Sequence, residues 1–180
     1  MWKIYTDGSC VGNPWPGGRA AVLQQKTEIK NQKAGKEVIL TWGETVTTNN
    51  QMELQAVIEV LEEIRRRRGK WEKKQVLPWG VGLFATEPEE QISEEIHIRT
   101  DSNYVKLGVT ERLSTRKRRN RRRAKGGKLI ENLDRRQRLA WLLEIFPQVH
   151  RYRVKGHAGD TLNEQVDTLA RQEAEKRSNN

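Results

Sequence analysis

The sequence predicts an α/β domain built on a mixed β-sheet, and three observations lead to this fold class. Alternating apolar and polar runs typical of strands occur before residue 47 and again after residue 94. Apolar stripes at helical spacing lie between and after these runs. The predicted order is β-β-β-α-β-α-α-β-α, in which the first three strands form an antiparallel meander and the helical segments cover the sheet faces.

The first strand is predicted at residues 2–6. It ends at Asp7, where Gly8 begins a tight polar turn. The second strand covers residues 19–24 behind a glycine pair, and the third covers residues 37–46. An aspartate before a glycine is most often a turn former, so this stretch alone does not indicate a functional site.

A cluster of N-cap residues at 47–50 precedes the first helix, which four arginines and a glycine bring to an end. Its apolar stripe consists of Leu54, Val57, Ile58, Leu61 and Ile64. Glu53 lies in the first turn, and a capping box with Asn50 explains it without any chemistry. Residues 70–94 are broken by proline and glycine, and we interpret them as an inserted excursion of unknown role.

The second half of the chain again places an acid at the end of a strand. Residues 95–101 alternate as a strand that ends in Asp101, and Ser102 fits the N-cap of the helix that follows. On that strand His97 lies opposite the isoleucine face, and we interpret it as structural. A further helix, capped by Asn132 or Asp134, is stopped by a proline at 147.

The last strand is predicted at residues 149–155, where His150 reads as a packed or surface histidine. A glycine-flanked loop carries His157, which is therefore expected to be mobile and exposed, as a proton shuttle would be. Asn163 starts the final helix, with Asp167 in its second turn. We expect one domain over residues 1–175 and a frayed tail over 176–180.

Composition indicates a polar, foldable protein with a polyanionic partner. Hydrophobic residues make up 34% and charged residues 32% of the chain, and the net charge is +10. The single cysteine excludes an internal disulfide and favours a reducing compartment. The N-terminus lacks the charge and apolar pattern of a signal peptide, so we expect a cytoplasmic protein and, without an evident protein partner, a monomer.

The positive charge is concentrated in two patches. Residues 65–74 carry +6 and residues 116–128 carry +9, which leaves −5 for the rest of the chain. A single run of this kind is usually a solvated or disordered charge run. Two runs in an otherwise acidic chain favour nucleic-acid binding.

Four acids occupy comparable places in the predicted elements. Asp7 and Asp101 follow threonines at strand ends, and Glu53 and Asp167 lie in early helix turns. If the two strands pair in parallel, the aspartates lie side by side, and their repulsion calls for a cation. Oxygen ligands suit Mg²⁺ or Mn²⁺, and two such ions would serve phosphodiester cleavage.

The chain resembles type 1 ribonuclease H over about residues 1–175. The matching motifs are Thr6-Asp7-Gly8-Ser9-Cys10 with Gly12-Asn13-Pro14, Thr47-Thr48-Asn49-Asn50 with Met52-Glu53-Leu54, Thr100-Asp101-Ser102, and Val154-Lys155-Gly156-His157-Ala158-Gly159 followed by Asn163-Glu164 and Asp167. Each motif is modest alone, and their common order makes the signal specific. The resemblance implies a ribonuclease H-like fold with a five-stranded mixed sheet, three antiparallel strands then two parallel ones, flanked by helices.

The resemblance also implies a function and a set of residues. The function is endonucleolytic cleavage of the RNA strand of RNA–DNA hybrids, with two Mg²⁺ ions and with 3′-hydroxyl and 5′-phosphate products. The implied metal-binding carboxylates are Asp7, Glu53, Asp101 and Asp167, and His157 would assist proton transfer or product release. The implied minor-groove contacts are Cys10, Asn13, Asn49, Asn50 and Asn103, with Thr48 on a DNA phosphate. The implied basic protrusion, 112–128, includes Arg116, Lys117, Arg118, Arg119, Arg121, Arg122, Arg123 and Lys125.

The chain departs from the family pattern in four places, one of which is the excursion at 70–94, longer than the family's usual link. Trp15 stands where the turn usually has glycine, and Asn103 stands where glutamine is frequent. The basic protrusion contains no tryptophan, so its binding should depend on phosphate charge and be sensitive to salt.

Two other functions fit the same fold. A hybrid- or RNA-binding module without catalysis would gain by losing buried like charges, whereas this chain keeps all four acids and His157. A nuclease or integrase that cuts DNA would have no 2′-hydroxyl for the asparagines to contact.

Overall fold

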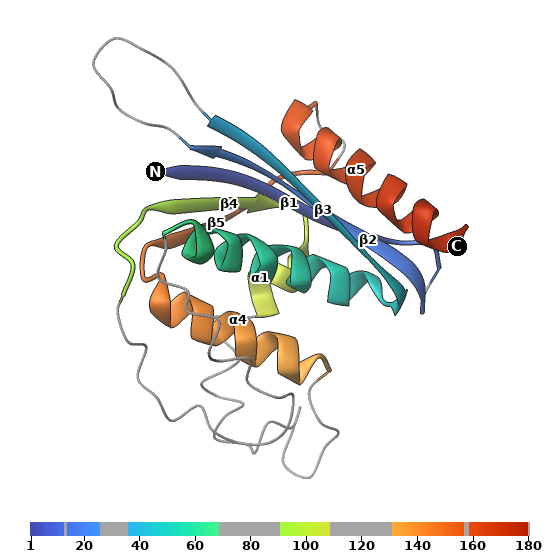
Figure 1. Cartoon of the computed structure of the whole chain (residues 1–180), viewed down its shortest axis with the longest axis horizontal. Helices are drawn as coiled ribbons and strands as arrows, with labels where there is room; N and C mark the ends of the chain where they lie inside the picture. The colour runs from blue at the N-terminus through green and yellow to red at the C-terminus, as the bar shows by residue number, and fades with distance from the viewer. Residues whose placement is uncertain (13, 26–35, 69–90, 109–130, 157–158, 180) are drawn as a thin grey trace.

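The computed structural model describes all residues except 13, 26–35, 69–90, 109–130, 157, 158 and 180. Its elements follow the predicted order (Figure 1). The strands are β1 (Trp2–Cys10), β2 (Trp15–Gln25), β3 (Lys36–Thr47), β4 (Ile96–Thr100) and β5 (Val149–Arg153). The helices are α1 (Asn49–Arg67), α2 (Asn103–Gly108), α4 (Leu133–Ile145) and α5 (Thr161–Ser178).

The strands form one five-stranded sheet in the order β3-β2-β1-β4-β5. β1, β2 and β3 pair antiparallel, whereas β4 pairs in parallel with both β1 and β5. The predicted fold class, including the meander and the two parallel strands, is therefore confirmed.

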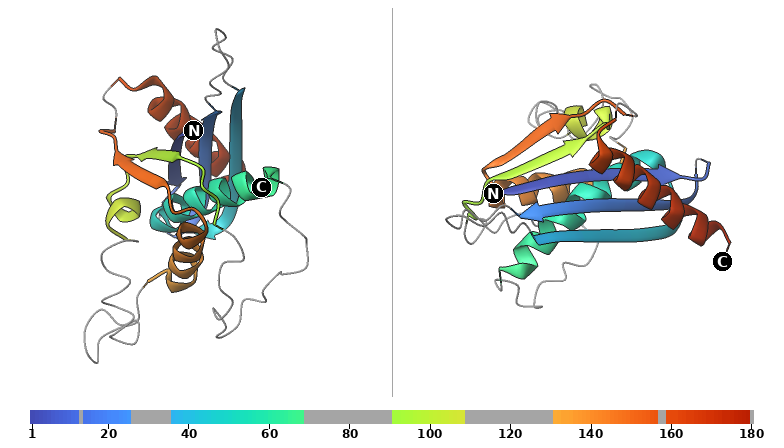
Figure 2. Two further views of the ribbon diagram at one scale, coloured as in Figure 1. Left: turned by 90° about the vertical axis from the view of Figure 1, so that its left-hand side faces the viewer. Right: turned by 90° about the horizontal axis from the view of Figure 1, so that it is seen from above.

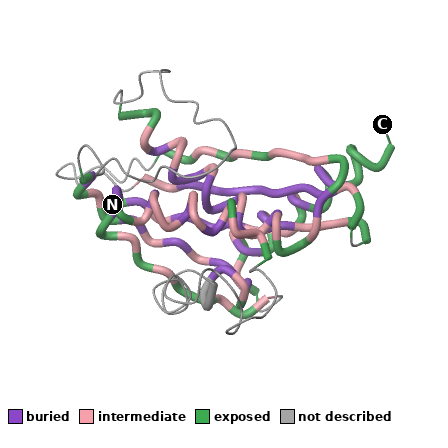
Figure 3. The backbone as a smooth tube through the Cα atoms, turned by 90° about the horizontal axis from the view of Figure 1, so that it is seen from below, coloured by how far each residue is buried: buried purple, intermediate pink, exposed green. Residues whose placement is uncertain are grey.

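Helices cover both faces of this sheet, because alternate strand residues are apolar on each face (Figures 1 and 2). On one face Ile4, Leu23 and Ile98 pack with the apolar stripes of α1 and α4 in the main core. On the other face Tyr5, Ala20 and Val22 pack with α5. Burial is deepest along β1 and β2 in the middle of the molecule and along the side of α1 that packs on them (Figure 3).

Several element boundaries differ from the sequence expectation, among them those at the end of the chain. α5 continues to Ser178, so most of the expected tail at 176–180 is helical. Basic residues in the last turn stabilise this end of the helix, because positive charge interacts favourably with the negative end of the helix dipole. The last strand ends at Arg153 instead of residue 155. None of the helices in the described part of the chain combines the length and apolarity needed to cross a membrane.

The excursion at 70–94 and the basic protrusion at 112–128 lie largely or wholly outside the described residues. The end of the excursion is described, and there Ile92 is buried in the main core. Its backbone N–H donates to the carbonyl of Ile145 at 2.7 Å. This contact ties the segment before β4 to the end of α4.

Candidate active site

Asp7 lies on β1, and Asp101 directly follows the end of β4, the neighbouring parallel strand. The paired residues run from Trp2 opposite Ile96 to Tyr5 opposite Arg99, and each aspartate is two residues further along. Since side chains two apart on a strand share a face, the carboxylate of Asp7, like the ring of Tyr5, belongs to the face of the sheet on which α5 lies. The predicted parallel pairing is therefore confirmed.

The prediction that the first strand ends at Asp7 is wrong. β1 continues to Cys10, with Asp7 opposite Ala20 and Cys10 opposite Gly17 on β2. β4, in contrast, ends at Thr100. Asp7 thus lies inside a continuous strand, at the point where one of its two neighbouring strands has ended.

Glu53 comes close to this point because α1 packs directly against the backbone of Gly8. A Cβ atom on Gly8 would lie 2.4 Å from the backbone nitrogen of Glu53 and 2.5 Å from the carbonyl carbon of Met52. Any side chain at this position would therefore push the helix away from β1. Glycine at residue 8 lets α1 carry Glu53 to the rim of the sheet.

Both carboxylate oxygens of Glu53 accept hydrogen bonds. The Ser102 hydroxyl donates to Oε2 at 2.5 Å, and the Asn49 amide donates to Oε1 at 3.1 Å. Ser102 Oγ also accepts from the backbone N–H of Val105 and so caps α2. These bonds fix the orientation of Glu53 relative to the end of β4.

The capping box expected from Asn50 and Glu53 is wrong. Thr48 is the N-cap of α1, and its hydroxyl accepts from the backbone N–H of Gln51 at 3.4 Å. The Gln51 side chain accepts from the backbone N–H of Thr48 at 3.2 Å. Glu53 therefore has no part in the capping box of α1.

Asp167 comes from α5, on the opposite side of the sheet from α1. The start of α5 is tied to β1 by the Tyr5 hydroxyl, which donates to Asp160 Oδ2 at 3.0 Å. Asp167 forms an ion pair with Arg171 one turn later, in which Nε donates to Oδ1 at 2.8 Å. Of the four acids, Asp167 therefore has a cationic partner within its own helix.

The charges of the other three acids act on Asp7. Burial, the negative charge of Asp101 and the weaker effects of Asp167 and Glu53 together raise the pKa of Asp7 to about 7, against a hydrogen bond from the Gly8 backbone that lowers it. Burial also raises the pKa of Glu53, and Asp101 adds to this, whereas the bond from Ser102 lowers it. The fold therefore brings the four predicted acids into one electrostatic cluster.

Such a cluster fits divalent cations. Four carboxylates supply only oxygen ligands, which are the ligands that Mg²⁺ and Mn²⁺ prefer. Their mutual repulsion, expressed in the raised pKa of Asp7, is what a bound cation would relieve.

The described hybrid-binding candidates gather around the same site. Thr48, Asn49 and Asn50 form the N-terminal end of α1, and Asn103 begins α2. Cys10 ends β1, and its thiol lies 3.6 Å from the carbonyl oxygen of Thr47 just before α1. Asn13 and His157 lie outside the described residues, as do all the named members of the basic protrusion.

The structure adds supporting residues that sequence reasoning missed. Gly156 lies against Asp101, because a Cβ on Gly156 would be 2.8 Å from Asp101 Oδ2. The side chain of Asn132 links Gln51 of α1 to Tyr104 of α2 through hydrogen bonds of 3.1 and 2.9 Å. No local sequence pattern predicts these long-range contacts, although Ser102 was recognised as a helix cap.

Comparison with known proteins matches the chain to one protein family. The family model described as RNase H matches residues 1–77 and 82–175. The chain is 39% identical over 175 residues to a ribonuclease H of Xanthomonas oryzae pv. oryzae, covering 96% of this chain and 91% of the relative. It is 36% identical over 169 residues to a ribonuclease H of Escherichia coli O9:H4, covering 94% and 86% respectively.

Solved structures agree on the fold. LC9-RNase H1, described as a type 1 RNase H with the type 2 active-site motif, superposes with a TM-score of 0.73 at 25% identity. That match covers 98% of this chain and 72% of the other. LC11-RNase H1, solved in complex with an RNA/DNA hybrid, superposes with a TM-score of 0.56 at 19% identity over 98% of both chains, which shows the shared fold.

Proposed function

The chain belongs to the RNase H family, and from this premise we propose that it is an endoribonuclease that hydrolyses the RNA strand of RNA–DNA hybrids. The products would carry 5′-phosphate and 3′-hydroxyl ends. The observation that carries the proposal is the clustering of Asp7, Glu53, Asp101 and Asp167, whose charges and burial raise the pKa of Asp7 to about 7.

We assign the four carboxylates as the ligands of two divalent ions, with Mg²⁺ as the first candidate and Mn²⁺ as the second. When bound, such ions activate a water molecule and stabilise the leaving oxygen in phosphodiester hydrolysis. The supporting residues keep the ligands in place: Ser102 and Asn49 orient Glu53, and Gly156, which has no side chain, leaves room for the Asp101 carboxylate. His157 would move a proton at the same site.

The substrate groove would begin at the end of β1 and continue over the N-termini of α1 and α2. Asn49, Asn50 and Asn103 offer amides that both donate to and accept from a 2′-hydroxyl, which distinguishes RNA from DNA. Cys10 and Asn13 would extend these contacts along the minor groove, and Thr48 would bind a phosphate of the DNA strand. The basic protrusion at 112–128 would hold the DNA strand through its charge.

The free protein would be a cytoplasmic monomer. One free cysteine and a net charge of +10 support a reducing compartment and a nucleic-acid partner.

A comparison of three substrates tests the function. Matched RNA–DNA hybrid, double-stranded RNA and double-stranded DNA are incubated with the protein, with Mg²⁺ or with a chelator. We expect cleavage of the hybrid alone, only with the metal, and only in its RNA strand. Cleavage of double-stranded DNA at a similar rate would overturn the proposal.

The Asp7→Asn variant tests the site. It should lose metal-dependent cleavage while its affinity for the hybrid survives, because the groove residues are unchanged. Near-normal turnover would remove Asp7 from the site.

The comparison of the three substrates also separates catalysis from a binding-only function. In a hybrid-binding module the four acids would repel the phosphate backbone without any benefit. If the wild-type protein binds the hybrid but cuts none of the three substrates, the binding-only function is correct.

A further inference from the structure

A second group of potential metal ligands lies on the sheet, away from the four carboxylates. α5 packs across β1, β2 and β3, and the right-hand view of Figure 2 shows β4 and β5 beside the area that it covers. Ile96 and Ile98 of β4 are buried in the core on the α1 side, so His97 between them points to the α5 side. This part of the sheet surface carries Glu95, His97 and His150.

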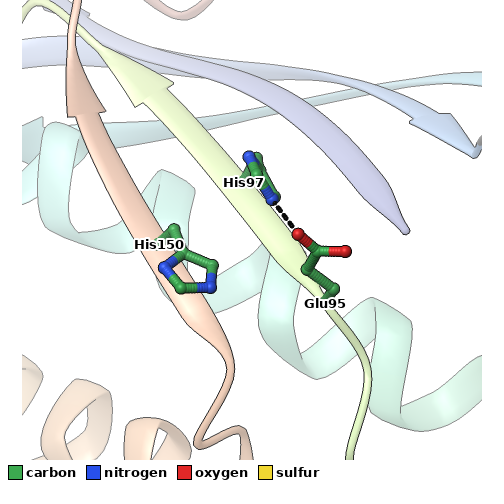
Figure 4. A group of neighbouring side chains, drawn as sticks. All are labelled: Glu95, His97 and His150. Atoms are coloured by element: carbon green, nitrogen blue, oxygen red, sulfur yellow. Dashed lines mark hydrogen bonds and ion pairs between the residues drawn. The ribbon is translucent and has the colours of Figure 1, made fainter.

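The register of the parallel strands brings the two histidines together. His97 of β4 is the direct partner of His150 on β5, and their ring centroids are 5.2 Å apart. Glu95 lies two residues before His97, and its Oε1 is 2.7 Å from His97 Nε2 (Figure 4). The potential ligand atoms of the three side chains all lie within 4.8 Å of one another.

One ligand is held in place while the others can adjust. The ring of His97 stacks on Tyr152, with centroids 5.4 Å apart and an angle of 19° between the planes. The side chain of His97 is 22% exposed, whereas that of Glu95 is 48% exposed and His150 is also exposed. Small rotations of Glu95 and His150 can therefore bring three ligand atoms around one point without disturbing the core.

We propose that Glu95, His97 and His150 bind a divalent transition-metal ion such as Zn²⁺. Two imidazoles and one carboxylate form a ligand set for zinc, whereas Mg²⁺ prefers oxygen ligands alone. Tetrahedral zinc with ligands at about 2.0–2.2 Å needs donor atoms roughly 3.4 Å apart, a modest contraction of the present cluster. The ion takes the place of the proton between Glu95 and His97, that proton is released to solvent, and water completes the coordination.

The simpler explanation is an ordinary surface arrangement. Glu95 and His97 form an ion pair when the histidine is protonated, and His97 gains stacking with Tyr152. These contacts account for two of the three residues. They give His150 no role, and the sequence has only three histidines, of which two meet on adjacent strands.

Binding at this site would connect β4 to β5, the outermost strand of the parallel part of the sheet. An ion that binds the folded state more tightly than the unfolded chain stabilises it by mass action. Zinc should therefore slow the exchange of amide hydrogens between β4 and β5 more than elsewhere in the sheet.

Calorimetric titration with Zn²⁺ tests the proposal, using protein without a histidine tag and with Mg²⁺ in excess to occupy the carboxylate site. We expect one zinc per chain. The variants His97→Gln and His150→Gln should each weaken binding at least about tenfold, since loss of even an outer-shell partner costs about 10- to 100-fold. Asp7→Asn and His157→Gln serve as matched controls and should retain the wild-type affinity.

Two further readouts keep the outcome clear. Circular dichroism and hybrid cleavage with Mg²⁺ establish that the His97 and His150 variants are folded. Absence of zinc binding by the wild type, or wild-type zinc affinity in either histidine variant, would overturn the proposal. Loss of zinc binding in Asp7→Asn or His157→Gln instead would assign the zinc to the carboxylate site and would equally overturn it.

Discussion

Removing the charge of Asp7 should stabilise the protein in the absence of metal, although it should abolish catalysis. The raised pKa of Asp7, about 7 against 3.8, means that the folded state disfavours the ionised carboxylate. A carboxyl group with a raised pKa in the folded state takes up protons on folding, so its ionisation lowers stability as the pH rises from about 4 to about 7. Above that range the full penalty remains.

The size of the effect follows from the shift. About three pKa units at about 1.4 kcal/mol each give an upper limit of roughly 4 kcal/mol. Asp7 keeps some contact with solvent, which screens the neighbouring charges, so we expect about 2 kcal/mol. Asparagine has almost the same shape, keeps a hydrogen-bonding oxygen and has no charge to bury.

Urea unfolding in EDTA measures this difference. At about pH 8 the Asp7→Asn variant should be more stable than the wild type by roughly 2 kcal/mol, and at about pH 4.5 the difference should be much smaller. Asp134→Asn, the same change at an exposed position in the first turn of α4, controls for the loss of one negative charge. Adding Mg²⁺ should stabilise the wild type by mass action and the Asp7 variant less. A difference between the two proteins that stays constant from about pH 4.5 to pH 8 would refute the reasoning.

Three further changes test the parts around the carboxylates. Gly156→Ala would place a Cβ 2.8 Å from Asp101 Oδ2, so the carboxylate must move. Because a displaced ligand misplaces the reacting groups, kcat should fall about tenfold or more, whereas urea unfolding should show little loss of stability. Ser102→Ala removes the bond that lowers the pKa of Glu53, so the acid limb of the pH–rate profile should move to higher pH, and an unchanged profile would exclude this positioning role. Replacing the arginines at 121–123 by glutamine should raise KM far more than it lowers kcat and should reduce the salt dependence of binding, and an unchanged KM would exclude the protrusion as a binding element.

Periodicity was sufficient to predict the fold because each element carries its own apolar pattern. The alternation around Ile96 and Ile98 predicts β4, and the stripe from Leu54 to Ile64 predicts α1; both are confirmed with their neighbours. Boundaries were harder to predict, since they depend on pairing between strands. β1 continues past Asp7 only because β2 is there to pair with it, and the turn residues Gly8 and Gly12 concealed that continuation.

The four acids could be proposed from the sequence because two of them follow threonines at predicted strand ends and two lie in early turns of predicted helices. The contacts that position them could not be predicted. Glu53 depends on the close approach of α1 to Gly8, and Asp101 depends on the backbone at Gly156. Both contacts join segments that are far apart in the chain, and only the assembled sheet brings them together. For the same reason the sequence led us to interpret His97 as structural and His150 as a packed or surface histidine, and only the register of β4 with β5 shows them to be neighbours.

The ligand types of the two clusters explain how they can coexist on one sheet. The carboxylate cluster has only oxygen ligand atoms, which are partly buried and repel one another. A bound hard cation should therefore stabilise the folded protein, and its removal should destabilise the fold. The second cluster is exposed, and Glu95 and His97 already satisfy one another, so it imposes no comparable penalty on the metal-free fold. A protein that only bound nucleic acid would gain stability from any neutral replacement of Asp7. An acid at this position, with the cost to folding that its raised pKa leads us to expect, is therefore physical support for catalysis, and the comparison of Asp7→Asn with wild type in EDTA measures that cost.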